Sequence, residues 1–222
     1  MRIETIYRYP VKGLTAEALE EVALTPGETL PHDRRFALAQ GDSTFDPAAP
    51  AWMPKRNFAC LMANARLALL HSAYDARSGE LVIRPLGAPP FVEAPGHSFS
   101  DVAKKVVSII GLSSLQALEQ AAGAKLDPLR FRANVYVSGG SPWAEFDWIG
   151  REILLGQARL RIVKRIVRCP ATEVNPATAE RDAAPPRWLR DHFGHADLGV
   201  YAEVLEGGRI SVGDALEVTD PD

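Results

Sequence analysis

A cysteine ends the most basic segment of this chain. Residues 159–168 contain five Lys or Arg and no acid, and Cys169 follows them directly. Pro170 comes next, and because proline donates no backbone hydrogen bond, we expect a strand to end here, with the thiol at a strand-to-loop junction. Neighbouring cations favour the thiolate, which is both a nucleophile and a ligand for a soft metal. A small buried side chain is the competing interpretation, and the pattern leaves both open.

The positive charge extends beyond this cysteine. Residues 125–168 hold nine Lys or Arg against four Asp or Glu, whereas the whole chain of 222 residues has a formal net charge of −3. Guanidinium groups bind phosphate oxygens in pairs, so the segment is compatible with a site for a small anionic ligand. A solvated strand face, neutralised by acids from elsewhere, is the alternative that the charge pattern by itself favours. Lys12, in the turn before Gly13, is a second place where an anion could meet a cation and backbone N–H groups.

Other residues that could do chemistry have simpler interpretations. Cys60 lies among apolar residues, so we expect it to pack in the core. Asp101 is either a helix cap or a proton donor, and capping is the simpler role. His192 and His195 have ligand-like spacing but no third ligand nearby, so we do not expect zinc there.

The composition excludes several classes of protein. A hydrophobic fraction of 46% and a charged fraction of 24% are typical of a soluble globular chain. No stretch reaches about 18 apolar residues, and the N-terminus shows no signal peptide. Two cysteines cannot build a disulfide framework or a four-cysteine iron–sulfur centre. We therefore expect a cytoplasmic protein with no membrane anchor and no bulk attraction to nucleic acid.

A fold rich in short strands must position these residues. Apolar runs bounded by Gly and Pro predict strands at Arg2–Arg8, 19–24, 35–39, 65–70, 80–84, 134–137, Glu152–Leu155, Ala158–Val167, 199–205, 209–212 and 215–218. Helices are expected at 102–110, ended by Gly111, from Ser113 or Ser114 to Gly123, and at 188–193. The glycines at 207–208 predict a hairpin, and the Pro-rich run 84–95 predicts a linker or domain-edge loop. This pattern indicates a mainly β fold with a few helices (α+β), as a barrel or closed sheet.

An ordered set of motifs resembles a known family. The motifs are IYRYPVKGLTAEAL, DRRFALA, KRNFACLMANARL, FRANVYVSGG, WIGREILLGQARLRIVKRIVRCPATEVNPAT and GVYAEVLEGGRISVGDALEV, and they extend through most of the chain. The chain resembles MOSC-domain proteins, in particular the group with an N-terminal β-barrel that includes the mitochondrial amidoxime-reducing component. The resemblance implies a β-rich N-terminal domain at residues 1–95 and a β-barrel MOSC domain at residues 96–222.

The same resemblance implies a cofactor and the residues that hold it. The cofactor is molybdenum carried by a pterin dithiolene (molybdenum-molybdopterin), and Cys169 of the Arg-Cys motif supplies a sulfur ligand to the metal. Ser100 and Asp101 match a Ser-Asp pair near the metal, with Asp101 as the candidate catalytic proton source. The residues expected to bind the cofactor are Lys12, Gly13, Arg34, Ser100, Arg132, Asn134, Arg168 and Tyr201. Gly13 stands where relatives often have Ser, and Asn175 and Ala179 replace an Asp and a Gly in the turn after the cysteine.

The resemblance favours one function and leaves a second. The first is a pyridoxal phosphate-independent oxidoreductase that reduces N-hydroxylated small molecules such as amidoximes or hydroxylamines, with electrons from a separate flavin or iron–sulfur protein. The second is a cofactor carrier or sulfur-transfer module in which Cys169 holds a persulfide. A nucleic-acid-binding barrel is disfavoured, because the chain is acidic and the basic strip has no pattern of stacking aromatic residues.

Overall fold

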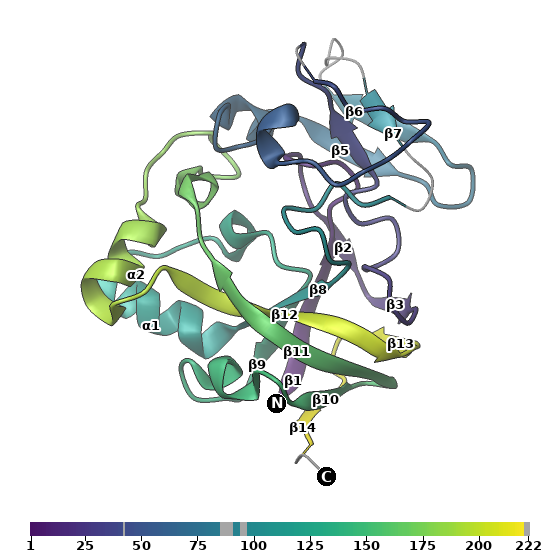
Figure 1. Cartoon of the computed structure of the whole chain (residues 1–222). Helices are drawn as coiled ribbons and strands as arrows, with labels where there is room; N and C mark the ends of the chain where they lie inside the picture. Colours follow the sequence, from purple (N-terminus) through teal and green to yellow (C-terminus); the bar gives the residue numbers. More distant parts are fainter. Residues whose placement is uncertain (42, 85–90, 94–96, 220–222) are drawn as a thin grey trace.

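A computed structural model of the chain describes residues 1–41, 43–84, 91–93 and 97–219. Most of its elements are strands, as the sequence predicts, and they form a large curled sheet with smaller strand pairs beside it (Figure 1). The sheet order is β14 (Leu216–Val218), β10 (Glu152–Leu155), β11 (Ala158–Val167), β12 (Asp197–Glu206), β8 (Val107–Gly111), β9 (Val135–Ser138), β1 (Arg2–Arg8) and β2 (Glu17–Leu19). β8 and β9 are parallel, and the other neighbours in this sheet are antiparallel.

Two apolar layers hold this sheet in place. Its inner face carries the main core, in which Leu160, Ile162 and Val200 are inaccessible to solvent. The outer face is covered by α1 (Leu112–Ala122) and α2 (Pro185–Phe193), which lie together on one side in Figure 1. β11 alternates buried and exposed residues along most of its length, so it presents one face to the core and sends its charged side chains outward.

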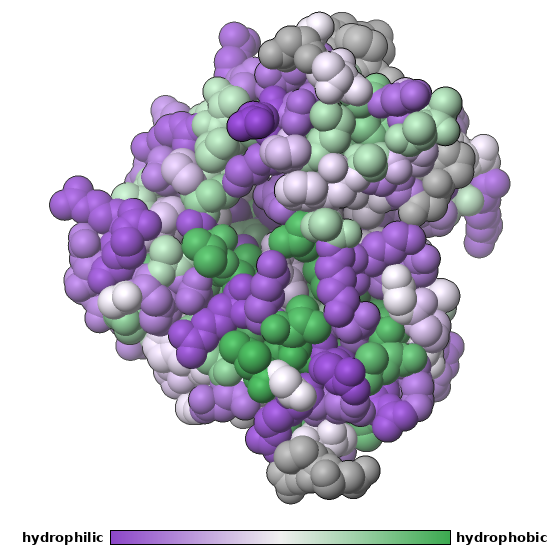
Figure 2. All heavy atoms as spheres, viewed as in Figure 1, coloured by the Kyte–Doolittle hydropathy of each residue, from purple (hydrophilic) through white to green (hydrophobic). Residues whose placement is uncertain are grey.

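The remaining strands form three pairs. β3 (Glu21–Leu24) pairs with β13 (Gly208–Ser211), β4 (Phe36–Leu38) with β7 (Phe91–Glu93), and β5 (His71–Tyr74) with β6 (Leu81–Arg84). A second apolar core lies under the β4–β7 and β5–β6 pairs and includes Val11, Phe36 and Leu38. Figure 2 shows the surface hollowed between the part that carries β5–β7 and the part that carries the large sheet.

The helix predicted at residues 102–110 is wrong. Residues 107–111 form strand β8, which is buried throughout and runs parallel to β9. The mostly apolar run at residues 106–110 fits a strand that is covered on both faces as well as it fits a helix. In the structure, Val107 and Ile109 enter the main core, and Ile110 packs under the helices. Gly111 therefore ends a strand and precedes α1, whereas Gly123 ends α1 in the left-handed conformation at φ 64°, as predicted.

Three further expectations need correction. The segment 65–70 contains a 3₁₀ helix, η2 (Ala65–Leu69), whose first turn is capped by the Asn64 side chain. The strand predicted at 19–24 is divided between β2 and β3. The glycines at 207–208 do not make a β12–β13 hairpin, because β13 pairs with β3 instead. They allow backbones to approach closely: a Cβ on Gly207 would lie 2.6 Å from the carbonyl oxygen of Leu24.

Several expectations are confirmed residue by residue, and others lie outside the described residues. β1, β10 and β11 have the predicted bounds. In the Pro-rich run 84–95, residues 91–93 form β7, whereas 85–90 and 94–95 lie outside the described residues. The domain boundary at residue 95 also lies there and stays a prediction. No helix in the described residues is long and apolar enough to cross a bilayer.

Candidate functional site

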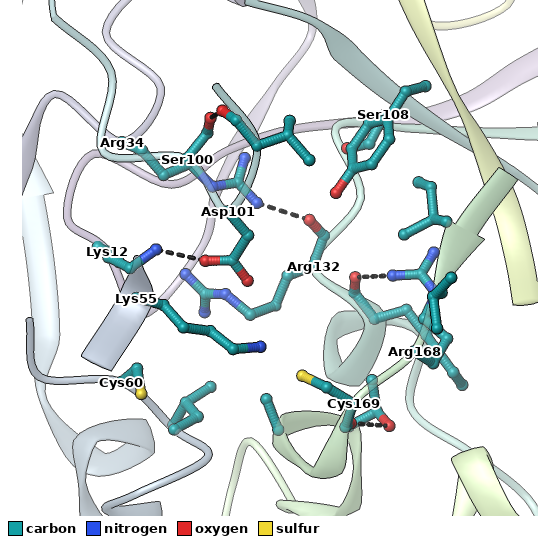
Figure 3. Close-up of a pocket in the computed structure, with 18 of the residues that line it drawn as sticks. Lys12, Arg34, Lys55, Cys60, Ser100, Asp101, Ser108, Arg132, Arg168 and Cys169 are labelled. Atoms are coloured by element: carbon teal, nitrogen blue, oxygen red, sulfur yellow. Dashed lines mark hydrogen bonds and ion pairs between the residues drawn. The ribbon is translucent and has the colours of Figure 1, made fainter. Parts of the chain in front are cut away.

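A cavity of about 350 Å³ lies between residues of the N-terminal part, such as Lys12, Arg34 and Lys55, and residues of the large sheet, such as Tyr201. Every residue that the sequence assigned to the site lines it: Lys12, Gly13, Arg34, Ser100, Asp101, Arg132, Asn134, Arg168, Cys169 and Tyr201. They come from segments far apart in the chain, including the turn after β1, the segment before β8, the end of β11 and the middle of β12 (Figures 1 and 3). Eight of the lining residues are cations and two are acids, so the cavity is strongly positive inside an acidic chain.

Two arginines meet over one aromatic ring at the base of this cavity. The guanidinium carbons of Arg34 and Arg132 lie 4.5 Å and 4.3 Å from the centroid of the Tyr9 ring. Arg34 also donates from Nη2 to the carbonyl oxygen of Arg132 at 2.7 Å and forms an ion pair with Asp33. Burial disfavours its charge, but Asp33 outweighs this and raises the pKa of Arg34.

Among the described residues, Arg132 has no acidic partner of this kind. Its Nη1 donates to the carbonyl oxygen of Leu14, whereas its Nη2 is buried and makes no hydrogen bond with the described residues. Burial, reinforced by the neighbouring Arg34 cation, lowers the pKa of Arg132 to about 10. A buried donor left unpaired is costly, so this corner of the cavity favours an anion that supplies the missing acceptor.

Lys12 and Asp101 form a second charged pair in the cavity. The backbone N–H of Lys12 donates to the carbonyl oxygen of Phe36 at 2.8 Å, and this hydrogen bond fixes the turn after β1. The buried ammonium group donates to the carbonyl oxygen of Phe99 at 2.9 Å and to the Asp101 carboxylate (Figure 3). Burial acts against the Asp101 charge, but Lys12 and Lys55 outweigh it and lower the pKa of Asp101. Asp101 is therefore a carboxylate at neutral pH, which favours accepting a hydrogen bond over donating a proton.

Cys169 lies where the sequence predicted, just beyond the end of β11. It is the residue just before the 3₁₀ helix η5 (Pro170–Glu173). The backbone N–H and the Oγ1 hydroxyl of Thr172 both donate to the Cys169 carbonyl oxygen, each at 3.0 Å. The side chain is partly exposed to the cavity, and Figure 3 shows its sulfur facing the open space. This placement makes the thiol accessible to a ligand while its backbone is held on both sides.

The cation beside the sulfur is one that sequence reasoning missed. Arg168 lines the cavity, but its guanidinium group is held by the backbone: Nε and Nη1 donate to the carbonyl oxygens of Leu198 and Phe131 at 2.8 Å and 2.9 Å. The Lys55 side chain, 114 positions before Cys169 in the sequence, instead extends into the cavity toward the thiol (Figure 3). Lys55 begins the motif KRNFACLMANARL, but nothing in that motif assigned it to the site, and only the fold brings it to the cavity. Cys60, expected in the core, is buried and also lines this cavity.

Three other predicted residues use their polar atoms in different ways. The Ser100 hydroxyl donates to the carbonyl oxygen of Val102 at 2.6 Å, which shapes the segment before β8. Gly13 has a φ of 84°, a conformation that favours glycine and explains the absence of a side chain there. Burial raises the pKa of Tyr201, so its hydroxyl stays protonated and can donate a hydrogen bond into the cavity.

Asn134 joins three strands with its side-chain amide. Its Oδ1 accepts from the backbone N and the hydroxyl of Ser108 at 3.1 Å and 2.8 Å, and its Nδ2 donates to the Tyr7 carbonyl oxygen at 3.2 Å. The residue is only 2% exposed. Asn134, just before β9, thus connects this strand to β8 and β1 beneath the cavity. Its role in binding a cofactor stays a prediction.

Replacing Asn134 with alanine should destabilise the protein. The change removes the hydrogen bonds that the Asn134 side chain makes to buried groups of Ser108 and Tyr7, at an expected cost of about 2–4 kcal/mol in the free energy of unfolding. Urea denaturation of the cofactor-free protein measures it. Ser108→Ala is the matched control and should cost only about 1 kcal/mol, because Asn134 N keeps its second acceptor, the Ser108 carbonyl oxygen at 3.1 Å. Equal losses in the two variants would contradict this account.

The turn after the cysteine holds an alanine in a strained conformation. Ala179 has a φ of 60°, and its N–H donates to the Asn175 carbonyl oxygen at 2.9 Å to close the turn. Left-handed backbone costs a residue with a Cβ about 1–2 kcal/mol, which is why glycine suits this position.

Replacing Ala179 with glycine should therefore stabilise the protein. Relief of strain exceeds the added freedom of the unfolded chain, so we expect a gain of about 0.5–1 kcal/mol and a melting temperature about 1–3 °C higher. Differential scanning calorimetry measures the shift. Ala177→Gly, in the same turn but without a positive φ, should lower the melting temperature. A rise in both variants, or in neither, would contradict the strain argument.

Comparison with known proteins adds to this geometry. The family model described as "MOSC domain" matches residues 94–217, and the one described as "MOSC N-terminal beta barrel domain" matches residues 1–121. Mitochondrial amidoxime-reducing component 1 of Mus musculus is 30% identical over 131 residues, which cover 54% of this chain and 37% of the mouse protein. The match thus spans little more than a third of that relative. The YuaD protein from Bacillus subtilis has a similar fold, with a TM-score of 0.55 and 16% identity over 100% of this chain and 96% of YuaD.

Proposed function

The chain belongs to the MOSC family, and from this premise we propose that it is an oxidoreductase that binds a molybdenum cofactor in its cationic cavity. The observation that carries the proposal is the meeting, in one cavity, of a partly exposed thiol and a buried guanidinium nitrogen that finds no acceptor among the described residues. A phosphorylated pterin dithiolene offers a complement to both: phosphate oxygens for Arg132, and a metal for the sulfur of Cys169.

The residues present fit such a group. Arg132, with Arg34 beside it, would hold the phosphate, and Lys12 adds an ammonium group on the same side of the cavity. Cys169 would supply the one protein sulfur ligand, with the pterin dithiolene supplying further sulfur donors. When bound, the molybdenum would supply a centre that accepts and delivers two electrons.

We propose N-hydroxylated small molecules, such as amidoximes, as substrates. Their reduction to an amidine and water consumes two electrons and two protons. The Asp101 carboxylate would accept a hydrogen bond from a substrate N–H, and the protonated Tyr201 hydroxyl would donate one toward the departing oxygen. This assignment differs from the proton-source role that the sequence suggested for Asp101, because the lysines beside Asp101 keep it ionised. Electrons would come from a separate flavin or iron–sulfur protein.

Metal and pterin content test this proposal. The full chain, expressed in a host that makes the cofactor, should contain about one molybdenum per chain by elemental analysis and release a fluorescent pterin on oxidation. Given a chemical electron donor, the loaded protein should convert benzamidoxime to benzamidine. Protein that carries neither metal nor pterin would overturn the proposal. A sulfane sulfur on Cys169 found by mass spectrometry, without turnover, would favour the sulfur-transfer function instead.

A further inference from the structure

Lys55 enters the cavity from a short element that is firmly anchored. It begins η1 (Lys55–Asn57), and its carbonyl oxygen accepts from the Phe58 N–H at 3.1 Å. The Phe58 ring is 2% exposed and packs at 5.0 Å, centroid to centroid, against the Phe99 ring. Because this aromatic contact fixes the backbone, the Lys55 side chain reaches across the cavity toward Cys169, as Figure 3 shows.

The other cations near Cys169 in the sequence are directed elsewhere. Arg168 is held by backbone carbonyl oxygens. The Arg165 guanidinium lies 4.2 Å from the centroid of the Phe146 ring and 4.0 Å from Asp197. The Lys164 ammonium lies 5.8 Å from the centroid of the Tyr201 ring. The basic strip that drew attention to Cys169 therefore does not supply the cation that faces its sulfur.

Lys55 lies in the cavity beside a charged pair formed by Lys12 and Asp101. Lys12 pairs with the Asp101 carboxylate, and Lys55 lies between that carboxylate and the sulfur. Partial burial works against the Lys55 charge, but Cys169 and Asp101 outweigh it and raise the pKa of Lys55. The ammonium group is thus charged at neutral pH and held on the sulfur side of the cavity.

We propose that Lys55 is a specificity residue of this site: its ammonium group faces the Cys169 sulfur across the cavity and gives the space in front of that sulfur a fixed positive charge. Small anions should reach the sulfur in preference to neutral molecules of the same shape. In the loaded enzyme, and resting there on the proposed function, the favoured substrates are N-hydroxylated compounds that carry a carboxylate close to the N–O group.

Alkylation of Cys169 tests the charge without any cofactor. Iodoacetate and iodoacetamide react in the same way: the thiolate sulfur bonds to carbon, the carbon–iodine bond breaks, and iodide leaves. Both reagents use the same thiolate, so the ratio of their rates is independent of the thiolate fraction and reports the local charge. The full chain, purified from a host unable to make molybdopterin, is treated with each reagent, and peptide mass spectrometry separates Cys169 from Cys60.

The variants make the result specific. In Lys55→Met, the iodoacetate-to-iodoacetamide ratio at Cys169 should fall about fivefold, the effect of one unit charge a few ångströms away at high dielectric. Lys55→Arg should largely keep the ratio. Lys105→Met makes the same change in net charge at a lysine paired with Glu28 outside the cavity, and should also keep it. In the unmodified protein the ratio should decrease as salt is added.

Failure of this inference is distinguishable from failure of the proposed function. An unchanged ratio in Lys55→Met, an equal fall in Lys105→Met, or a ratio insensitive to salt would overturn the role of Lys55, whatever the metal content. A metal-free wild-type protein would overturn the molybdenum proposal and leave the alkylation ratios standing. With loaded enzyme, Lys55→Met should also reduce the preference in kcat/KM for a carboxylate-bearing substrate over its amide, and Lys55→Arg should restore it.

Discussion

Cys169→Ser should leave the protein folded and without stoichiometric molybdenum. The substitution removes the one sulfur ligand that we assign to the protein, and a serine hydroxyl is a much poorer ligand for a soft metal. Since the side chain is partly exposed and its backbone is held by Thr172, the fold should tolerate the change. We expect molybdenum to fall to below about a tenth of the wild-type content, and reduction of N-hydroxylated substrates to fall with it.

The second cysteine of the cavity shows whether this loss is specific. Cys60→Ser removes the other thiol, which is buried on the opposite wall, and should keep most of the molybdenum. Elemental analysis of both variants, purified side by side, measures the difference. Wild-type molybdenum in Cys169→Ser, or equal losses in the two variants, would show that Cys169 is not the metal ligand.

Arg132→Met should have opposite effects on stability and on cofactor binding. Burial without an acidic partner lowers the pKa of Arg132 to about 10, and a depression of this size corresponds to roughly 3 kcal/mol of destabilisation while the side chain is charged. Methionine fills similar space without charge, but it forfeits the hydrogen bond to Leu14 and the contact with Tyr9. We expect the cofactor-free variant to be about 1–2 kcal/mol more stable than wild type in urea denaturation.

The gain should depend on pH in a defined direction. Because the folded-state pKa of Arg132 is depressed, the unfolded chain binds the extra proton above about pH 10, and wild-type stability rises with pH there. The advantage of Arg132→Met should therefore be constant below about pH 10 and shrink above it. An advantage that grows above pH 10 would contradict this sign.

The same variant should lose the cofactor. A charge-assisted hydrogen bond to phosphate contributes about 1.5–3 kcal/mol, so cofactor affinity should fall at least tenfold. Pterin fluorescence after oxidation measures the retained cofactor. Arg159→Met is a suitable control, because that arginine is paired with Glu206 on the outer face of the sheet. A less stable Arg132→Met that retains its pterin would refute both halves of the expectation.

The basic strip on β11 shows why composition alone could not identify the ligand. Arg159 forms ion pairs with Glu152 and Glu206, and Arg161 pairs with Glu152 as well. These acids lie on neighbouring strands, so the solvated-face interpretation is correct for this part of the strip. The end of the strip, from Lys164 to Arg168, does line the cavity, but most of the cavity's cations come from other segments, such as Arg34 and Arg132, which are 98 positions apart in the sequence.

The sequence by itself determined the local features of this protein. Strand Ala158–Val167, the junction at Cys169 and the end of α1 at Gly123 follow from residues that are neighbours in the chain, because proline, glycine and apolar alternation restrict the backbone locally. The ordered motifs, compared with a family, also identified the ten residues that the structure brings to one cavity.

Only the tertiary structure decided what depends on distant partners. Residues 107–111 form a strand because β9 and β12 pair with its edges while the main core and the core under the helices cover its two faces, which no periodicity within the segment reveals. Packing likewise brought Lys55 into the cavity of Cys169, turned Arg168 toward carbonyl oxygens, and left Arg132 without an acidic partner among the described residues. Charge and hydrogen bonding act through space, so the chemistry of each group depends on neighbours that the fold, not the order of residues, supplies.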